Sequence, residues 1–189
     1  MPRGVYLRPE TGERESFQCA PGPAGWRYVS TSTTRVDLTV DSRWRPARLE
    51  LTSGPWTLRG GCAGKDLLWL RTASDAQGTE HTAEAYAFLG DSPAFLITIA
   101  RSLNLHPGET ADTPLIAIEG PSLAARRVTR RWTLLTTTDH PTDLGPLPVQ
   151  HWQSLDPETA ELTSFHLAGD ILLSAPNLEL TELNSPPNL

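Results

Sequence analysis

Residues 47–59, ARLELTSGPWTLR, decide the fold class of this 189-residue chain. The first six residues alternate apolar and polar side chains, as a strand does when one face is buried and the other is wet. The tripeptide SGP is a turn signal, and WTLR repeats the alternation until Gly60-Gly61 ends it. Two alternating segments joined by a short turn predict a β-hairpin and thus an antiparallel sheet.

The same pattern recurs along the chain, with Pro, Gly, Asn and Asp in most of the intervals. Further predicted strands cover residues 5–7, 67–71, 85–89, 95–103, 115–119, 128–135, 162–167 and 178–183. Strands at this short spacing predict an all-β protein with little helix, built as one curved antiparallel sheet in a spiral β-roll or half-barrel. We expect a single domain over 1–189, with a partly irregular segment at 1–25 and a loose tail at 184–189.

Residues 122–135, SLAARRVTRRWTLL, fit two structures. A helix capped by Ser122 would place Val128, Trp132 and Leu135 on one stripe. A strand would place Val128 and Trp132 on one face, together with Arg130. The Thr-rich end that follows favours the strand.

Composition and charge exclude several classes of function. The net charge of −6 argues against binding nucleic acid through its phosphates. No apolar run is long enough to span a bilayer, and the first fifteen residues do not resemble a signal peptide. We therefore expect a soluble, cytoplasmic protein of bacterial type. The spacing of Cys19, Cys62 and the five histidines predicts no metal site, and no cofactor is expected.

The tripeptide Gly90-Asp91-Ser92 matches the start of an esterase signature in which the serine attacks an ester carbonyl. Such an enzyme also needs a base and a group that orients the base, and no Asp-x-x-His follows Ser92. We therefore interpret residues 90–93 as a turn in which Asp91 or Ser92 caps backbone amides. Hydrolysis by Ser92 remains the alternative.

Arginines and tryptophans are the candidate ligand-binding side chains. Residues 126–131 form a basic cluster in an acidic protein, which is either a solvated face or a site for an anionic headgroup. Six tryptophans either fill the core or line a pocket. A curved sheet with few helices leaves an apolar concavity, which is a common place for a ligand.

The order of several motifs resembles that of a known family. Asp41-x-x-Trp44-Arg45-x-x-Arg48, followed by an alternating strand, is similar to a segment of the glycolipid-binding domain family of unknown function. Residues 92–103 resemble its Thr-Pro…Ile-Arg-Arg-Leu segment, and 165–178 resemble its closing segment. The resemblance spans residues 26–183 and implies a spiral β-roll with a lipid or glycolipid ligand. It implies no catalytic residues.

These observations predict non-enzymatic binding of an apolar or amphipathic small molecule in the concavity of the sheet. The candidate lining residues are Trp44, Phe95 and Trp132, and the candidate partners of a headgroup are Arg45, Arg101 and Arg130. Burial of an acyl chain would contribute ~0.8 kcal/mol per methylene. The alternatives are a Ser92 hydrolase and a protein-interaction module that uses an exposed sheet edge.

Overall fold

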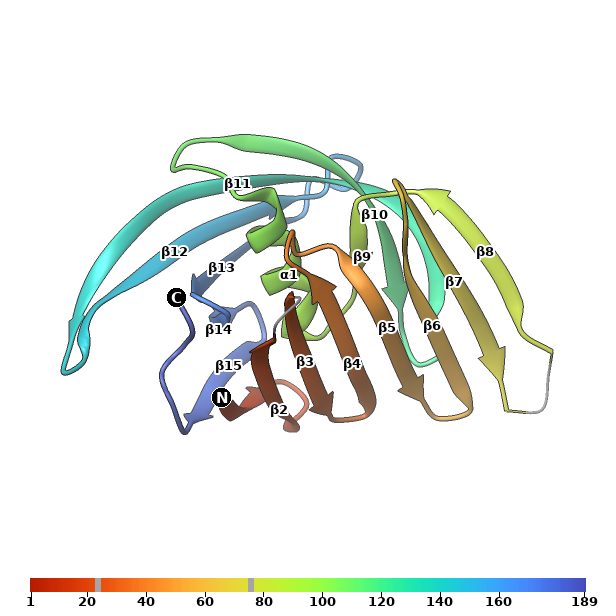
Figure 1. Cartoon of the computed structure of the whole chain (residues 1–189), viewed down its shortest axis with the longest axis horizontal. Coiled ribbons are helices and arrows are strands. Elements are labelled where there is room, and N and C mark those ends of the chain that lie inside the picture. The colour runs from red at the N-terminus through yellow and green to blue at the C-terminus, as the bar shows by residue number, and fades with distance from the viewer. Residues whose placement is uncertain (23–24, 75–76) are drawn as a thin grey trace.

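The computed structural model of the chain describes residues 1–22, 25–74 and 77–189. Within these residues the chain forms one sheet of 15 strands and one α-helix (Figure 1). In chain order the elements are β1 (Arg3–Arg8), β2 (Glu13–Gly22), β3 (Gly25–Thr31), β4 (Thr34–Asp41), β5 (Pro46–Ser53), β6 (Trp56–Ala63), β7 (Asp66–Ala73), β8 (Thr79–Glu84), β9 (Ala87–Leu89), α1 (Pro93–Leu103), β10 (Thr110–Glu119), β11 (Ala124–Thr142), β12 (Gly145–Leu155), β13 (Leu162–Ala168), β14 (Ile171–Ala175) and β15 (Leu178–Leu183).

The strands lie in the order β8 to β1 followed by β15 to β9, so the first and last strands of the chain pair in the middle of the sheet. Neighbouring strands are antiparallel, except for β9 and β10, which are parallel. A parallel pair needs a crossover connection, and α1 supplies it. The sheet is curved and unclosed, with β8 and β9 at its edges, which confirms the predicted all-β fold with a single curved sheet.

Helix α1 lies within the arch of the sheet (Figure 1). Ile97 and Ile99 are completely buried and belong to one core cluster with side chains from both halves of the sheet. Among the largest buried side chains are Trp132, Trp152 and Tyr28. Helix α1 therefore fills the central part of the concave side, where the sequence led us to expect an apolar hollow.

The predicted strand over 95–103 is wrong, because these residues belong to α1. Pro93 is tolerated in the first turn of a helix, where its missing N–H has no intrahelical partner. The helix ends at Asn104, whose φ of 47° is left-handed. Periodicity alone cannot distinguish a buried strand from a buried helix in so apolar a run, and the β-branched residues 97–99 favoured the wrong choice.

Several other boundaries differ from the predictions. The segment 1–25 is mostly β1 and β2, although residues 23 and 24 lie outside the described part of the chain. Residues 122–135 contain the start of β11, so the strand interpretation is the right one, and β11 continues to Thr142. The expected hairpin end at Gly60-Gly61 lies inside β6. The tail 184–189 has no regular structure, but Asn188 donates hydrogen bonds to both carboxylate oxygens of Asp170.

Within the described ranges, no helix has the length and apolar character needed to cross a membrane.

Replacement of Ile97 by alanine tests whether α1 is part of the core. We expect Ile97→Ala to lower the free energy of unfolding by about 2–5 kcal/mol, since it leaves a cavity at a site with no solvent exposure. Leu144→Ala is the control, because Leu144 is 82% exposed and its loss should cost less than about 0.5 kcal/mol. Equal losses in urea denaturation would contradict the placement of α1.

Candidate functional site

Two hollows lie beside opposite ends of α1. One is next to the first turn, at Ser92 and Phe95, and we call it the Glu15 cavity. The other is next to the last turn, at Ala100 and Arg101, and we call it the Trp44 groove. The cavity has a volume of about 90 Å³ and the groove of about 360 Å³.

The Trp44 groove combines an aromatic ring with arginine and amide side chains. Its polar and aromatic lining includes Arg43, Trp44, Arg101, Asn104, Gln150 and Trp152. Trp44 and Arg101 also line a further hollow of about 290 Å³ beside Trp26 and Asp170. The groove therefore offers a flat apolar surface together with several hydrogen-bond donors, which is the usual composition of a small-molecule site.

The turn between β4 and β5 holds Trp44 in an unusual backbone conformation. The side chain of Asp41 accepts hydrogen bonds from the backbone N–H of Arg43 at 2.8 Å and of Arg45 at 2.9 Å. Trp44, at the centre of this turn, has a φ of 62°, which is rare for a bulky residue. Backbone strain of this kind costs of order 1–3 kcal/mol and is concentrated at functional sites. Trp44 is thus presented at the groove at a cost in stability.

Arg101 faces the ring of Trp44. Its guanidinium carbon is 5.2 Å from the centroid of the Trp44 ring, within the range of a cation–π contact. The ring of Trp44 also packs against that of Trp26, with 5.2 Å between the ring centroids. Among the residues that the structure describes, no carboxylate forms an ion pair with Arg101. The half-buried positive charge of Arg101 is therefore open to an anionic group.

Arg45 is adjacent in sequence but has a different role. Its Nη2 donates to the sulfur of Cys62 at 3.2 Å, and its guanidinium lies 6.0 Å from the ring of Tyr86. Arg45 does not line the groove. Burial raises the pKa of the Cys62 thiol, which disfavours a thiolate partner for Arg45. Arg45 thus contacts Cys62 and Tyr86 instead of facing the groove.

The other sequence-based candidates do not lie at the groove. Phe95 is buried in the wall of the Glu15 cavity. Arg130 forms an ion pair with Asp156 at 3.2 Å, so the carboxylate that an inward arginine needs is already present. Trp132 is fully buried and packs edge-on against Phe165. The structure therefore unites Trp44 with Arg101 and separates the remaining four residues from them.

Three of the four arginines in the basic cluster at 126–131 form ion pairs with carboxylates. Arg126 forms an ion pair with Glu119 at 2.6 Å, and Arg131 binds both carboxylate oxygens of Asp112. Arg127 donates to the backbone oxygen of Glu84. Arg126, Arg130 and Arg131 are thus neutralised by carboxylates, whereas the exposed Arg127 has no ion-pair partner among the described residues.

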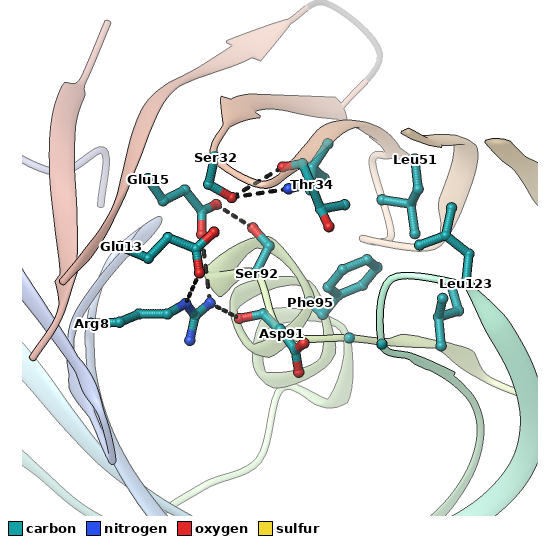
Figure 2. Close-up of a pocket in the computed structure, with 14 residues that line it drawn as sticks. Arg8, Glu13, Glu15, Ser32, Thr34, Leu51, Asp91, Ser92, Phe95 and Leu123 are labelled. Carbon is teal, nitrogen blue, oxygen red and sulfur yellow. Dashed lines mark hydrogen bonds and ion pairs between the residues drawn. The ribbon is translucent and has the colours of Figure 1, made fainter. Parts of the chain in front are cut away.

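The Glu15 cavity contains a buried carboxylate that the sequence analysis missed (Figure 2). Glu15 is 3% exposed, and its Oε1 accepts hydrogen bonds from the hydroxyls of Ser92 at 2.6 Å and Tyr28 at 3.2 Å. Burial raises the pKa of Glu15 above its ordinary value. The sequence did contain a signal for its burial, because Glu15, Phe17 and Cys19 occupy alternate positions of β2 and so face the same side of the sheet.

Ser92 immediately precedes α1, and its hydroxyl bonds to Glu15 instead of capping the helix. No histidine is among the described residues that line the cavity. Pro93, the next residue, has no N–H to stabilise an oxyanion. Within the described residues, no group of three or more His, Cys, Asp or Glu side chains could hold a metal ion.

Comparisons with known proteins show the fold and no more. No family model and no curated protein matches the chain. A DUF1089 family protein from Pseudomonas aeruginosa is 18% identical, with a TM-score of 0.55 over 87% of this chain and 83% of that one. A beta-barrel-like protein of the domain of unknown function DUF1849 from Brucella abortus is 12% identical, with a TM-score of 0.50 over 97% and 96%. Both structures are of domains of unknown function.

The pH dependence of stability tests the burial of Glu15. The pKa of Glu15 is higher in the folded protein than in the unfolded chain, where it is about 4.3, so the folded state favours the neutral carboxyl. The stability that Glu15 contributes is therefore fully present below about pH 4.3 and is lost as the pH rises through its pKa in the folded protein. Glu15→Gln keeps the shape of the side chain but cannot ionise, so the variant does not lose this stability as the pH rises. We expect the unfolding free energy of the variant, relative to the wild type, to increase between about pH 4 and pH 8.

Glu182→Gln is the matched control, since Glu182 is 61% exposed on the side chain and pairs with Arg14 on the surface. Its stability should follow that of the wild type at every pH. If the unfolding free energies of Glu15→Gln and the wild type changed with pH in parallel, burial would not raise the pKa of Glu15.

Proposed function

We propose that this protein binds an amphipathic small molecule with an anionic polar headgroup, such as an acidic lipid or glycolipid, at the Trp44 groove. The observation that carries the proposal is the guanidinium of Arg101, which lies over the ring of Trp44 and has no ion-pair partner in the described part of the chain. A sugar ring can stack on the indole, while a carboxylate or phosphate accepts hydrogen bonds from Arg101. Asn104 and Gln150 add amide groups for hydroxyl recognition.

The dimensions of the hollows support recognition of the headgroup over enclosure of a long chain. The groove of about 360 Å³ falls within the range of small-ligand sites, of order 300–1,000 Å³. Helix α1 occupies the concave face that would otherwise receive an acyl chain. The apolar part of the ligand would therefore contact the partly buried Leu105 at the groove and extend outward.

A pair of glycosides that differ in charge tests this proposal. We expect octyl glucuronide to bind more tightly than octyl glucoside in calorimetry below their micelle concentrations. A charge-assisted hydrogen bond contributes about 1.5–3 kcal/mol, so the preference should be roughly 10- to 100-fold. Arg101→Gln should abolish the preference, and Trp44→Leu should weaken binding of both glycosides.

Arg35→Gln is the control, because Arg35 is an exposed arginine on β4 away from the groove lining. It should bind both glycosides as the wild type does. Equal affinity of the wild type for the charged and neutral glycosides, or full retention of binding in Arg101→Gln, would contradict the proposal.

Hydrolysis by Ser92 is a second candidate, favoured by the 2.6 Å hydrogen bond from its hydroxyl to Glu15. A carboxylate with a raised pKa can act as a general base. The absence of an N–H on Pro93 and the small cavity make this the weaker candidate. Turnover of p-nitrophenyl acetate that is lost in Ser92→Ala would support catalysis, and no turnover by the wild type would exclude this ester from its substrates.

A further inference from the structure

We propose that the Glu15 cavity is a second binding site, separate from the Trp44 groove, and that it takes a small primary ammonium compound with a short alkyl chain. The lining of the cavity is divided into two walls (Figure 2). Glu13, Glu15 and Ser92 lie on one side, while Phe95, Leu51 and Leu123 lie on the other. A ligand that fills it must therefore combine a polar end with an apolar one.

The charges of the polar wall select a cation. Glu13, Glu15 and Asp91 contribute carboxylates to the lining, and Arg8 contributes the one guanidinium. The positive end of the α1 dipole, near Ser92, is equivalent to roughly half a charge. This positive charge is smaller than the net negative charge of the lining side chains when Glu15 is ionised. The cavity therefore favours an ammonium group over an anion.

The ion pairs of Arg8 with Glu13 and Glu15 are long, so the carboxylate oxygens can accept a hydrogen bond from another donor. Arg8 Nη2 lies 3.8 Å from Glu15 Oε2, and Arg8 Nε lies 3.6 Å from Glu13 Oε2, both longer than a direct hydrogen bond. The guanidinium of Arg8 is held in place by a 2.8 Å bond to the backbone oxygen of Asp91. Both hydrogen bonds to Glu15 go to Oε1, so among the described residues Oε2 has no donor at direct hydrogen-bond distance. The buried hydroxyl of Ser30 is nevertheless near enough to Glu15 to lower its pKa.

A primary ammonium group matches the acceptors that remain. It carries three N–H donors, and the cavity offers Glu15 Oε2, a Glu13 oxygen and the free lone pairs of Ser92 Oγ. The hydroxyl of Ser92 donates its proton to Glu15, so its oxygen can still accept. Val36, Leu51, Phe95, Ile118 and Leu123 would contact the alkyl chain. A volume of about 90 Å³ restricts that chain to a few carbons.

Proton linkage gives this site a further signature. The charged and titratable groups around Glu15 are Arg8, Glu13 and Asp91 at the cavity, and the buried Tyr6 and Tyr28. Burial raises the pKa of Glu15, and a bound ammonium group would favour its ionised form. Ammonium affinity should therefore increase as the pH rises from acid towards neutral, whereas the affinity of an uncharged analogue should not.

The test is an NMR titration with n-butylammonium chloride, n-butanol and sodium butyrate. We expect saturable shifts of the amides of Glu15, Ser92 and Phe95 with butylammonium, at least tenfold weaker binding of butanol, and none of butyrate. Affinity should rise about fourfold per methylene from ethyl- to butylammonium. Glu15→Gln should weaken butylammonium binding at least tenfold, whereas Glu182→Gln should leave it unchanged.

The wild-type pH series provides evidence that does not depend on how the variants fold. Equal binding of butylammonium and butanol, a pH-independent ammonium affinity, or unchanged binding by folded Glu15→Gln would each overturn the proposal. Arg101→Gln should retain butylammonium binding, since Arg101 does not line this cavity. Loss of the preference for the charged glycoside in Arg101→Gln and loss of ammonium binding in Glu15→Gln are thus separate results.

Discussion

Coverage of the concave face of the sheet is the constraint on which the rest of the structure depends. An antiparallel sheet with one apolar face must bury that face against another layer. Here the sheet is unclosed, and α1 supplies the second layer from inside the arch (Figure 1). The connection from β9 to β10 through α1 also joins the two runs of antiparallel strands, so one segment of eleven residues completes both the topology and the core.

The position of α1 also places the two hollows and separates their chemistry. Ser92, before the first turn, is bonded to the buried Glu15, while Arg101, in the last turn, faces Trp44. Negative charge near the N-terminus of a helix and positive charge near its C-terminus both complement the helix dipole. The acidic cavity and the basic groove are thus electrostatically compatible with the helix that lies between them. Their different charges are the reason for assigning them different ligands.

The sequence was a good guide to the sheet and a partial guide to the groove. Alternation of apolar and polar residues located strands such as β5 and β7, because one face of these strands is buried and the other is wet. Trp44 and Arg101 were identified, but their contact depends on packing between α1 and the β4–β5 turn. Glu15 was missed, although its parity with Phe17 predicts that it faces inward.

The sequence by itself determined the fold class, since a two-residue period with frequent turns is compatible only with a sheet whose faces differ in polarity. It also determined which side chains could share a strand face. Only the tertiary structure decided that residues 93–103 are a helix, because an apolar, β-branched run fits a buried strand or a buried helix, and the choice depends on the core against which it packs. Likewise, an arginine is paired, as Arg130 is, or lacks a carboxylate partner among the described residues, as Arg101 does, according to which distant segments supply carboxylates near it.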